Sequence, residues 1–285
     1  MVSLVKGFLK KPSCNFLNYM IHCRAALAFN KNDRKDMNFS HLDWETRFLK
    51  TNQAVRNDSF GIPARVKKVH YPIRLIRYWF MYHFLREASA RGPVSVCEIG
   101  VDTGQMKQFV DSNLSAPFYS RWQAVDCKVQ KEALLSSGYT EFVEADIESP
   151  DFRLNDKFDA MILLHVLEHL HEPENVVRKL APFLNKGGIM IGGFPVTPHW
   201  LSAAREKKIR KTARKYGHVS VFSPQRVKAM AEGAGLTVEY MSGAFFMRKQ
   251  GFFLENYNWW LRFNLFFGAI FPGWPGEVYW VFRKA

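Results

Sequence analysis

The chain has 285 residues, which is enough for one large domain or for one domain with a sizeable accessory segment. Hydrophobic residues make up 47% and charged residues 23%, as in an ordinary globular protein with a core. The formal net charge of +14 favours an anionic partner, such as nucleic acid, an acidic membrane surface or a phosphorylated substrate.

The cysteines and the apolar segments indicate the compartment. Neither a C-x-x-C pair nor zinc-type spacing occurs among Cys14, Cys23, Cys97 and Cys127, so we expect reduced thiols. No secretory signal pattern is evident, and no run of about 18 to 20 apolar residues occurs. We therefore expect a cytoplasmic protein without a membrane span.

The texture of the sequence changes near residue 90. Residues 1–90 are basic and show no strand pattern, and residues 73–86 place apolar side chains at helical spacing before a stop at Arg91-Gly92-Pro93. From Val94 onward, short apolar runs alternate with helical stretches, which is typical of βαβ units and a parallel sheet. We predict a helical basic extension over residues 1–90 and an α/β domain over residues 91–285.

Seven strands and four helices are expected in this domain. The expected strands are Val94–Ile99, Arg121–Val125, Glu141–Glu144, Phe158–Leu164, Ile189–Gly193, Leu236–Met241 and Glu277–Arg283. The expected helices are Gln105–Asn113, Val129–Ser136, Glu174–Leu184 and Pro224–Ala234. Two insertions interrupt the pattern, a basic one at about 199–218 and an aromatic one at about 246–276.

A glycine turn follows the first expected strand. Gly100 allows a sharp turn in which backbone amides can approach a ligand, and Gly104 allows the next helix to pack closely. A dinucleotide-binding protein begins in a similar way. Glu98 differs from that pattern, because a carboxylate before the first glycine suits a cationic ligand better than a pyrophosphate.

Acidic residues close the next two strands. Asp126 ends the second strand at the distance that suits binding of two ribose hydroxyls, although a polar residue that merely ends a strand is an equal alternative. Asp146 would face an adenine amino group. The fourth strand then runs into His165-Val-Leu-Glu168-His169, and Gly187-Gly188 precedes the fifth strand. The order and spacing of these elements are more specific than any one of them.

These motifs resemble the class I S-adenosylmethionine-dependent methyltransferases over about residues 94–236. The resemblance is strongest to the subgroup in which Val-Leu-Glu-His-Leu follows the fourth strand, which includes ubiquinone-pathway, lipid-headgroup and sugar methyltransferases. It implies a Rossmann-like, seven-stranded, mostly parallel sheet with helices on both faces. It also implies the following contacts with S-adenosylmethionine: Glu98, Gly100, Asp102 and Gly104 with the methionine part, Asp126 with the ribose, Asp146 and Ile147 with the adenine, and His165 beside the methyl-bearing end.

The sequence departs from the family at Asp102, where relatives usually have a glycine. Aspartate tolerates unusual backbone angles better than most residues, but the substitution leaves open how well the cofactor binds. His165-Val-Leu-Glu168-His169 also fits the H-x-x-E-H pattern of one metalloprotease group. A five-residue pattern arises easily by chance, and we predict no metal, although some relatives carry a cation at an acidic and histidine cluster here.

Methyl transfer requires in-line alignment and, for a hydroxyl acceptor, a base. Histidine titrates near neutrality, so His169, His199 and His218 are the candidates, with His218 and His169 assigned as catalytic. A structural role is the alternative for both: His218 can fix its loop by hydrogen bonding, and His169 can stabilise a helix start.

The two insertions bear on the acceptor and on partners. Seven basic residues crowd positions 205–215, and the aromatic insertion contains Trp259, Trp260 and Trp274. Together they favour an acceptor that is small, lipid-linked, glycan-linked or isoprenoid-type. They also favour an anionic membrane surface as partner, with the protein bound to the inner face of the membrane. A solvated helix face and a substrate lid are the alternative interpretations. A nucleic-acid methyltransferase and a catalytically silent cofactor-binding protein remain as other functions.

Overall fold

The computed structural model describes residues 38–50, 68–114, 117–214 and 217–285. Much of the predicted N-terminal extension, including Cys14 and Cys23, therefore lies outside the described residues. The described residues before position 91 belong to the same compact unit as the sheet, which spans residues 37–285. The alternation of strands and helices starts at Val94.

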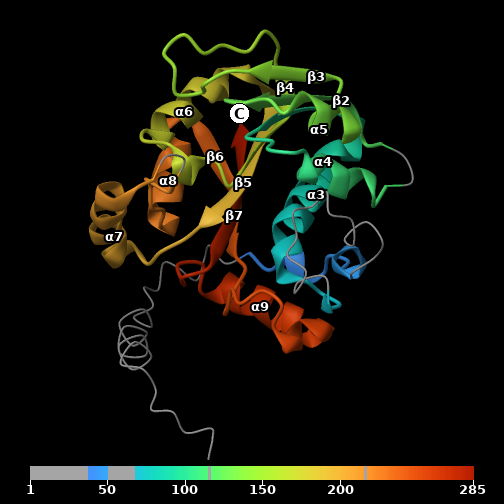
Figure 1. Cartoon of the computed structure of the whole chain (residues 1–285), viewed down its shortest axis with the longest axis vertical. Coiled ribbons are helices and arrows are strands. Elements are labelled where there is room, and N and C mark those ends of the chain that lie inside the picture. The colour runs from blue at the N-terminus through green and yellow to red at the C-terminus, as the bar shows by residue number, and fades with distance from the viewer. Residues whose placement is uncertain (1–37, 51–67, 115–116, 215–216) are drawn as a thin grey trace, which may run out of the picture. The chain divides into compact units, whose positions relative to one another are not determined.

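The described residues form one seven-stranded sheet in the order β3-β2-β1-β4-β5-β7-β6 (Figure 1). Its strands are β1 (Val94–Ile99), β2 (Tyr119–Asp126), β3 (Glu141–Glu144), β4 (Phe158–Leu164), β5 (Leu184–Pro195), β6 (Leu236–Gly243) and β7 (Glu277–Lys284). β1 to β5 pair in parallel, and β7 runs antiparallel between β5 and β6. The predicted Rossmann-like, mostly parallel sheet is confirmed.

Helices cover both faces of this sheet, as predicted. The described helices are α3 (Ile76–Ala88), α4 (Gln105–Asp111), α5 (Lys131–Ser136), α6 (Pro173–Leu180), α7 (His199–Thr212), α8 (Pro224–Gly233) and α9 (Asn258–Ile270). Residues of α3, α4 and α5 share one hydrophobic core with alternate strand residues such as Val96 and Ile162. Residues of α6 and α8 share the other core with Cys97 and Met161. Successive strand residues serve opposite cores because side chains alternate across a strand.

Both insertions contain a helix. α7 lies within the predicted basic insertion and packs beside α8, whereas α9 lies within the aromatic insertion and packs on β6 (Figure 1). α8 begins at a sequence signal, because the hydroxyl of Ser223 accepts a hydrogen bond from the backbone N–H of Arg226 at 3.3 Å and Pro224 occupies the first helical position. Among the described residues, no helix is long and apolar enough to cross a membrane.

Candidate active site

The candidate site lies where the strand order reverses. β1 has β2 on one side and β4 on the other, although β2 and β3 precede β4 in the chain. In open α/β sheets, ligands bind outside the carboxyl ends of the strands at such a point. The glycine turn follows β1, and His165 follows β4. The structure therefore places the predicted cofactor loop and His165 at the same edge.

The turn after β1 is left-handed at three residues. Gly100 has φ +74°, Asp102 φ +49° and Gly104 φ +82°. A Cβ atom on Gly100 would lie 2.4 Å from Cγ2 of Val166, so this position also requires close approach. Asp102, which stands where relatives usually have a glycine, thus keeps a left-handed backbone. Aspartate adopts this conformation more readily than most residues.

Asp126 lies beside this turn. Its carboxylate accepts hydrogen bonds from the backbone N–H groups of Asp102 at 3.2 Å and Lys128 at 3.1 Å. The carboxylate of Asp102 in turn accepts from the side-chain amides of Gln105 at 3.0 Å and Gln130 at 3.2 Å. The ends of β1 and β2 are therefore joined by a polar network with an exposed Asp102. This geometry suits a ligand that has several hydroxyl donors.

The next strand end is partly apolar. Asp146 is exposed and accepts a hydrogen bond from the N–H of Glu148 at 2.9 Å, while the side chain of Ile147 is buried. An apolar side chain next to an exposed carboxylate suits a flat aromatic ring that carries an amino group. The structure is thus compatible with the adenine contacts expected from the sequence.

Glu98 is buried at the end of β1. Its Oε2 accepts hydrogen bonds from the hydroxyl of Tyr139 at 2.5 Å and the indole N–H of Trp122 at 2.9 Å. Burial raises the pKa of Glu98 to about 7, and the two hydrogen bonds oppose that rise. Both groups that donate to Oε2 of Glu98 are side chains of the protein itself. Glu98 therefore forms part of the floor of the site.

His165 is held between two buried carboxylates. Its Nδ1 lies 2.8 Å from Oε1 of Glu168, and its Nε2 lies 3.5 Å from Oε1 of Glu277. His165 also has a left-handed backbone with φ +57°, which is uncommon for a residue other than glycine. Burial lowers the pKa of His165, whereas the charge of Glu277 raises it. The resulting pKa lies above the ordinary value.

Sequence reasoning missed the charged cluster around Glu277. This carboxylate is 1% exposed, and its Oε1 accepts hydrogen bonds from Arg77 at 2.9 Å and Arg248 at 2.6 Å. The hydroxyl of Tyr279 donates to its other oxygen. Burial alone would raise the pKa of Glu277, but Arg77, His165 and Arg248 hold this pKa well below its ordinary value. The signal in the sequence was a single acid at the head of an otherwise apolar strand.

His169 and His218 are neighbours, although 49 positions separate them in the printed sequence. Their ring centroids are 4.8 Å apart, because the backbone carbonyl of Glu168 accepts hydrogen bonds from the N–H groups of Val219 and Ser220. Burial lowers the pKa of His218 and the charge of Glu168 opposes this change, so the resulting pKa lies below the ordinary value. His199 lies elsewhere, at the start of α7, where its Nδ1 is 3.0 Å from the hydroxyl of Ser223.

Three potential metal ligands meet at this point. One ligand atom each from Glu168, His169 and His218 lies within 4.8 Å of the others. Among the described residues, Oε2 of Glu168 is buried and has no hydrogen-bond partner. Our expectation that no metal binds here stays a prediction.

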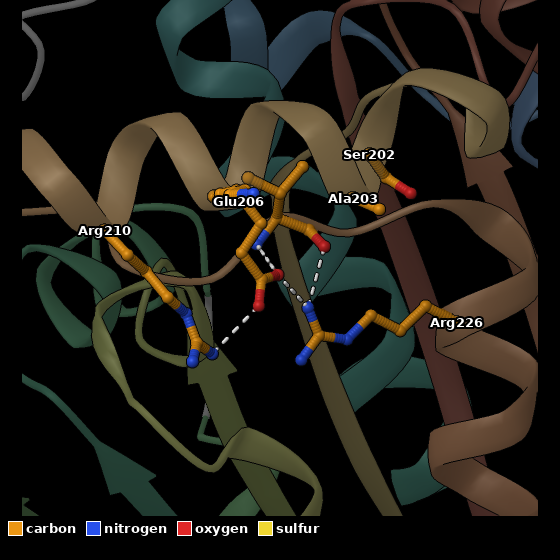
Figure 2. Close-up of a pocket in the computed structure, with 7 residues that line it drawn as sticks. Ser202, Ala203, Glu206, Arg210 and Arg226 are labelled. Atoms are coloured by element: carbon orange, nitrogen blue, oxygen red, sulfur yellow. Dashed lines mark hydrogen bonds and ion pairs between the residues drawn. The ribbon is translucent and has the colours of Figure 1, made fainter.

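A polar pocket of about 470 Å³ lies between α7 and the chain before α8 (Figure 2). Glu206 lies at its centre, where its carboxylate pairs with Arg210 at 2.8 Å and Arg226 at 2.5 Å. Arg226 also pairs with Glu174 at 2.6 Å. The pair between Glu206 and Arg226 attaches α7 to α8, the pair between Glu206 and Arg210 lies within α7, and the pair between Arg226 and Glu174 joins α8 to α6. The pocket contains no residue predicted for cofactor binding.

The glycine turn, the neighbouring strand-end carboxylates and the histidine after β4 lie at the carboxyl edge of a Rossmann-like sheet. Comparison with known proteins identifies the family. The family model described as "Methyltransferase domain" matches residues 70–240, which is more than half of the chain. The chain belongs to the class I S-adenosylmethionine-dependent methyltransferases, and it is a methyltransferase whose cofactor is S-adenosylmethionine.

Solved structures are similar to this chain at low sequence identity. A candidate sarcosine dimethylglycine methyltransferase from Galdieria sulphuraria is 12% identical with a TM-score of 0.53, over 73% of this chain and 84% of that chain. The N-methyltransferase NodS from Bradyrhizobium japonicum, solved with S-adenosylhomocysteine, is 17% identical with a TM-score of 0.45, over 72% and 85%. Magnesium protoporphyrin IX methyltransferase from Synechocystis, with S-adenosylhomocysteine bound, is 14% identical with a TM-score of 0.46, over 73% and 82%. No curated protein sequence matches the chain.

Proposed function

We propose that this methyltransferase methylates oxygen or nitrogen of a small or amphipathic acceptor of the glycan, lipid-linked or isoprenoid type. The observation that carries the cofactor assignment is the contact between Asp102 and Asp126 across the left-handed turn. The bound cofactor supplies an electrophilic methyl group on a sulfonium. In this proposal the chain binds the methionine part over Glu98, Gly100, Asp102 and Gly104.

The other contacts follow the carboxyl edge of the sheet. Asp126 binds the ribose hydroxyls, and Asp146 and Ile147 bind the adenine. His165 borders the methyl-bearing end. The remaining task of the protein is to hold the acceptor atom in line with the methyl group.

His218 is the proposed base for a hydroxyl acceptor. Its depressed pKa keeps the imidazole neutral, and the exposed ring can accept a proton. His169 lies edge to face with this ring and is proposed to orient it. A nitrogen acceptor that is already neutral would need only the alignment.

Calorimetry on the full chain tests the cofactor site. S-Adenosylhomocysteine should bind and nicotinamide dinucleotides should not. Replacing Asp126 by alanine should weaken binding by about 1 to 3 kcal/mol, because buried hydroxyls lose a charged partner. Asp156→Ala is the matched control, since Asp156 pairs with Arg121 outside the proposed site. Dinucleotide binding in place of S-adenosylhomocysteine, or equal affinity in both variants, would contradict the assignment.

A membrane-facing surface is the second part of the proposal. α9 exposes Trp259, Phe263 and Phe266 at spacings of four and three residues, with exposed fractions of 57%, 39% and 47%. Phe253 and Tyr257, just before the helix, are also exposed. An amphipathic helix with aromatic rings on one face suits the headgroup boundary of a bilayer. We therefore propose that the protein is cytoplasmic and binds the inner face of an anionic membrane through this surface.

The structure changes which residues can contribute to this surface. Trp260 is only 7% exposed and packs into the domain, so Trp259 is the tryptophan of α9 that can meet lipid. Five basic residues of the other insertion lie on α7, a separate helix beside α8 (Figure 1), whereas Arg214 follows the helix and Lys215 lies outside the described residues. Arg210 of that run faces Glu206 and Val219, whereas Lys207, Lys208 and Lys211 are exposed.

Vesicle co-sedimentation tests this surface, with phosphatidylcholine vesicles that contain or lack phosphatidylglycerol. Each cation near an acidic surface contributes about 1 kcal/mol, an effect that fades over about 10 Å at 0.1 M salt. Binding should weaken with salt but persist, because burial of the aromatic rings is insensitive to salt.

A double variant isolates the contribution of the rings. Trp259→Ser with Phe266→Ser should lose the salt-resistant part of the binding, whereas Leu135→Ser, which changes a 58% exposed side chain on α5, should not. No binding at low salt would remove the membrane proposal. Binding of RNA that outcompetes vesicles, with a steep salt dependence, would favour a nucleic-acid methyltransferase instead.

A further inference from the structure

Two arginine side chains and one histidine ring converge on one carboxylate oxygen. Oε1 of Glu277 lies 2.9 Å from Arg77, 2.6 Å from Arg248 and 3.5 Å from Nε2 of His165. Arg77 comes from α3, Arg248 from the loop after β6, and His165 from the end of β4. Elements distant in the sequence therefore bring these three side chains to one point.

The charges of this cluster do not balance. Arg77 and Arg248 carry two positive charges, whereas Glu277, the carboxylate that they share, carries one negative charge. Arg77 and Glu277 are largely buried, with side chains 15% and 1% exposed. Among the described residues, Nε of Arg77 and Nε2 of His165 are buried and make no hydrogen bond. An uncompensated charge away from water is costly, so the cluster favours a further anion.

The position of the cluster separates it from the cofactor loop. Glu277 pairs with Pro195 at the carboxyl end of β5, and three strand spacings separate β7 from β1 in the sheet order. Neighbouring strands lie about 4.8 Å apart, so Glu277 is about 14 Å along the edge from the glycine turn. His165, beside the proposed methyl end, lies between the two. The cluster is thus on the side from which an acceptor would reach the methyl group.

Both guanidinium groups can bind an additional ligand. Each arginine has five N–H donors in a planar fork, and in each of these ion pairs one nitrogen contacts Glu277. The side chain of Arg248 is 40% exposed, so a solute can reach it. Glu277 and the hydroxyl of Tyr279 hold this arrangement in place.

We propose that Arg248 and Arg77 form an anion subsite, which binds a carboxylate or phosphate group carried by the methyl acceptor. The inference rests on the proposed function and narrows its acceptor to a molecule with an anionic group near the methylated atom. Arg248 is the accessible half of the subsite. Glu277 is a positioning residue that keeps the two guanidinium groups together.

The experiment uses the full chain saturated with S-adenosylhomocysteine. Inorganic phosphate or malonate is titrated at constant ionic strength, and the thermal unfolding midpoint is recorded. A saturable rise in the midpoint is expected. Arg248→Gln should weaken the apparent affinity for the anion at least about tenfold, because a charge-assisted bidentate contact is lost. Lys249→Gln removes the same charge from the adjacent exposed residue, which contacts the ring of Phe252, and should leave that affinity within about twofold.

A second measurement separates the acceptor's anion from the carboxylate of the cofactor. Arg248→Gln should bind S-adenosylhomocysteine and 5′-methylthioadenosine, which lacks the amino-acid part, as the unaltered chain does. If phosphate competes with S-adenosylhomocysteine, and Arg248→Gln weakens that ligand alone, the arginines bind the cofactor and the proposal fails. It also fails if the anions have no effect, or if both variants behave alike. If the unaltered chain does not bind S-adenosylhomocysteine at all, the proposed function itself is refuted.

Discussion

The turn after β1 can be tested by placing a methyl group on Gly100. Alanine at this position must adopt φ +74°, which costs about 1 to 2 kcal/mol. Its Cβ would also lie 2.4 Å from Cγ2 of Val166, and overpacking of this kind costs about 1 to 3 kcal/mol more. Gly100→Ala should therefore lower the free energy of unfolding by about 2 to 5 kcal/mol, measured by urea denaturation.

Gly187 provides a matched control. It has nearly the same backbone angle, φ +73°, but a Cβ atom there would meet nothing within 4 Å. Gly187→Ala should cost only the backbone strain, about 1 to 2 kcal/mol. Val166→Ala removes the clashing atom, so the double variant with Gly100→Ala should show a favourable coupling of about 1 to 3 kcal/mol. Equal costs at the two glycines, or no coupling with Val166, would refute the close contact between the turn and the segment after β4.

Two further predictions concern titration and catalysis. The pKa of Glu98 is raised from 4.5 to about 7 in the folded chain, so the protonated form favours folding and its contribution is lost as the pH rises from 4.5 through 7. The free energy of unfolding of Glu98→Gln, measured with urea, should therefore rise by about 3 kcal/mol relative to that of the unaltered chain between pH 4.5 and pH 8. A difference between the two free energies that does not change with pH would contradict this pKa. His218→Ala should lower the rate of transfer to a hydroxyl acceptor about 10²-fold or more while calorimetry shows unchanged binding of S-adenosylhomocysteine; a parallel loss of binding would make the residue structural.

The strands of the sheet could be predicted from the sequence. The bounds expected for β1, β3 and β4 match the structure. For β1 and β4 the reason is that central parallel strands are short apolar runs delimited by turn residues. The fold class and the cofactor family followed from the same pattern, since the glycine turn and the strand-end carboxylates are encoded in short, contiguous segments. At Asp102, the sequence indicated a tolerated departure, and the structure shows the left-handed backbone that explains it.

The tertiary structure alone determined which distant side chains meet. The ion pair between Arg77 and Glu277 joins residues 200 positions apart, and no local period relates them. The neighbouring tryptophans of α9 have different environments, because Trp259 faces outward and Trp260 packs inward at 7% exposure. His218 reaches His169 only because the loop around Val219 bonds the carbonyl of Glu168. Such contacts depend on how helices and loops pack against the sheet edge, which a one-dimensional pattern of apolar and polar residues does not specify.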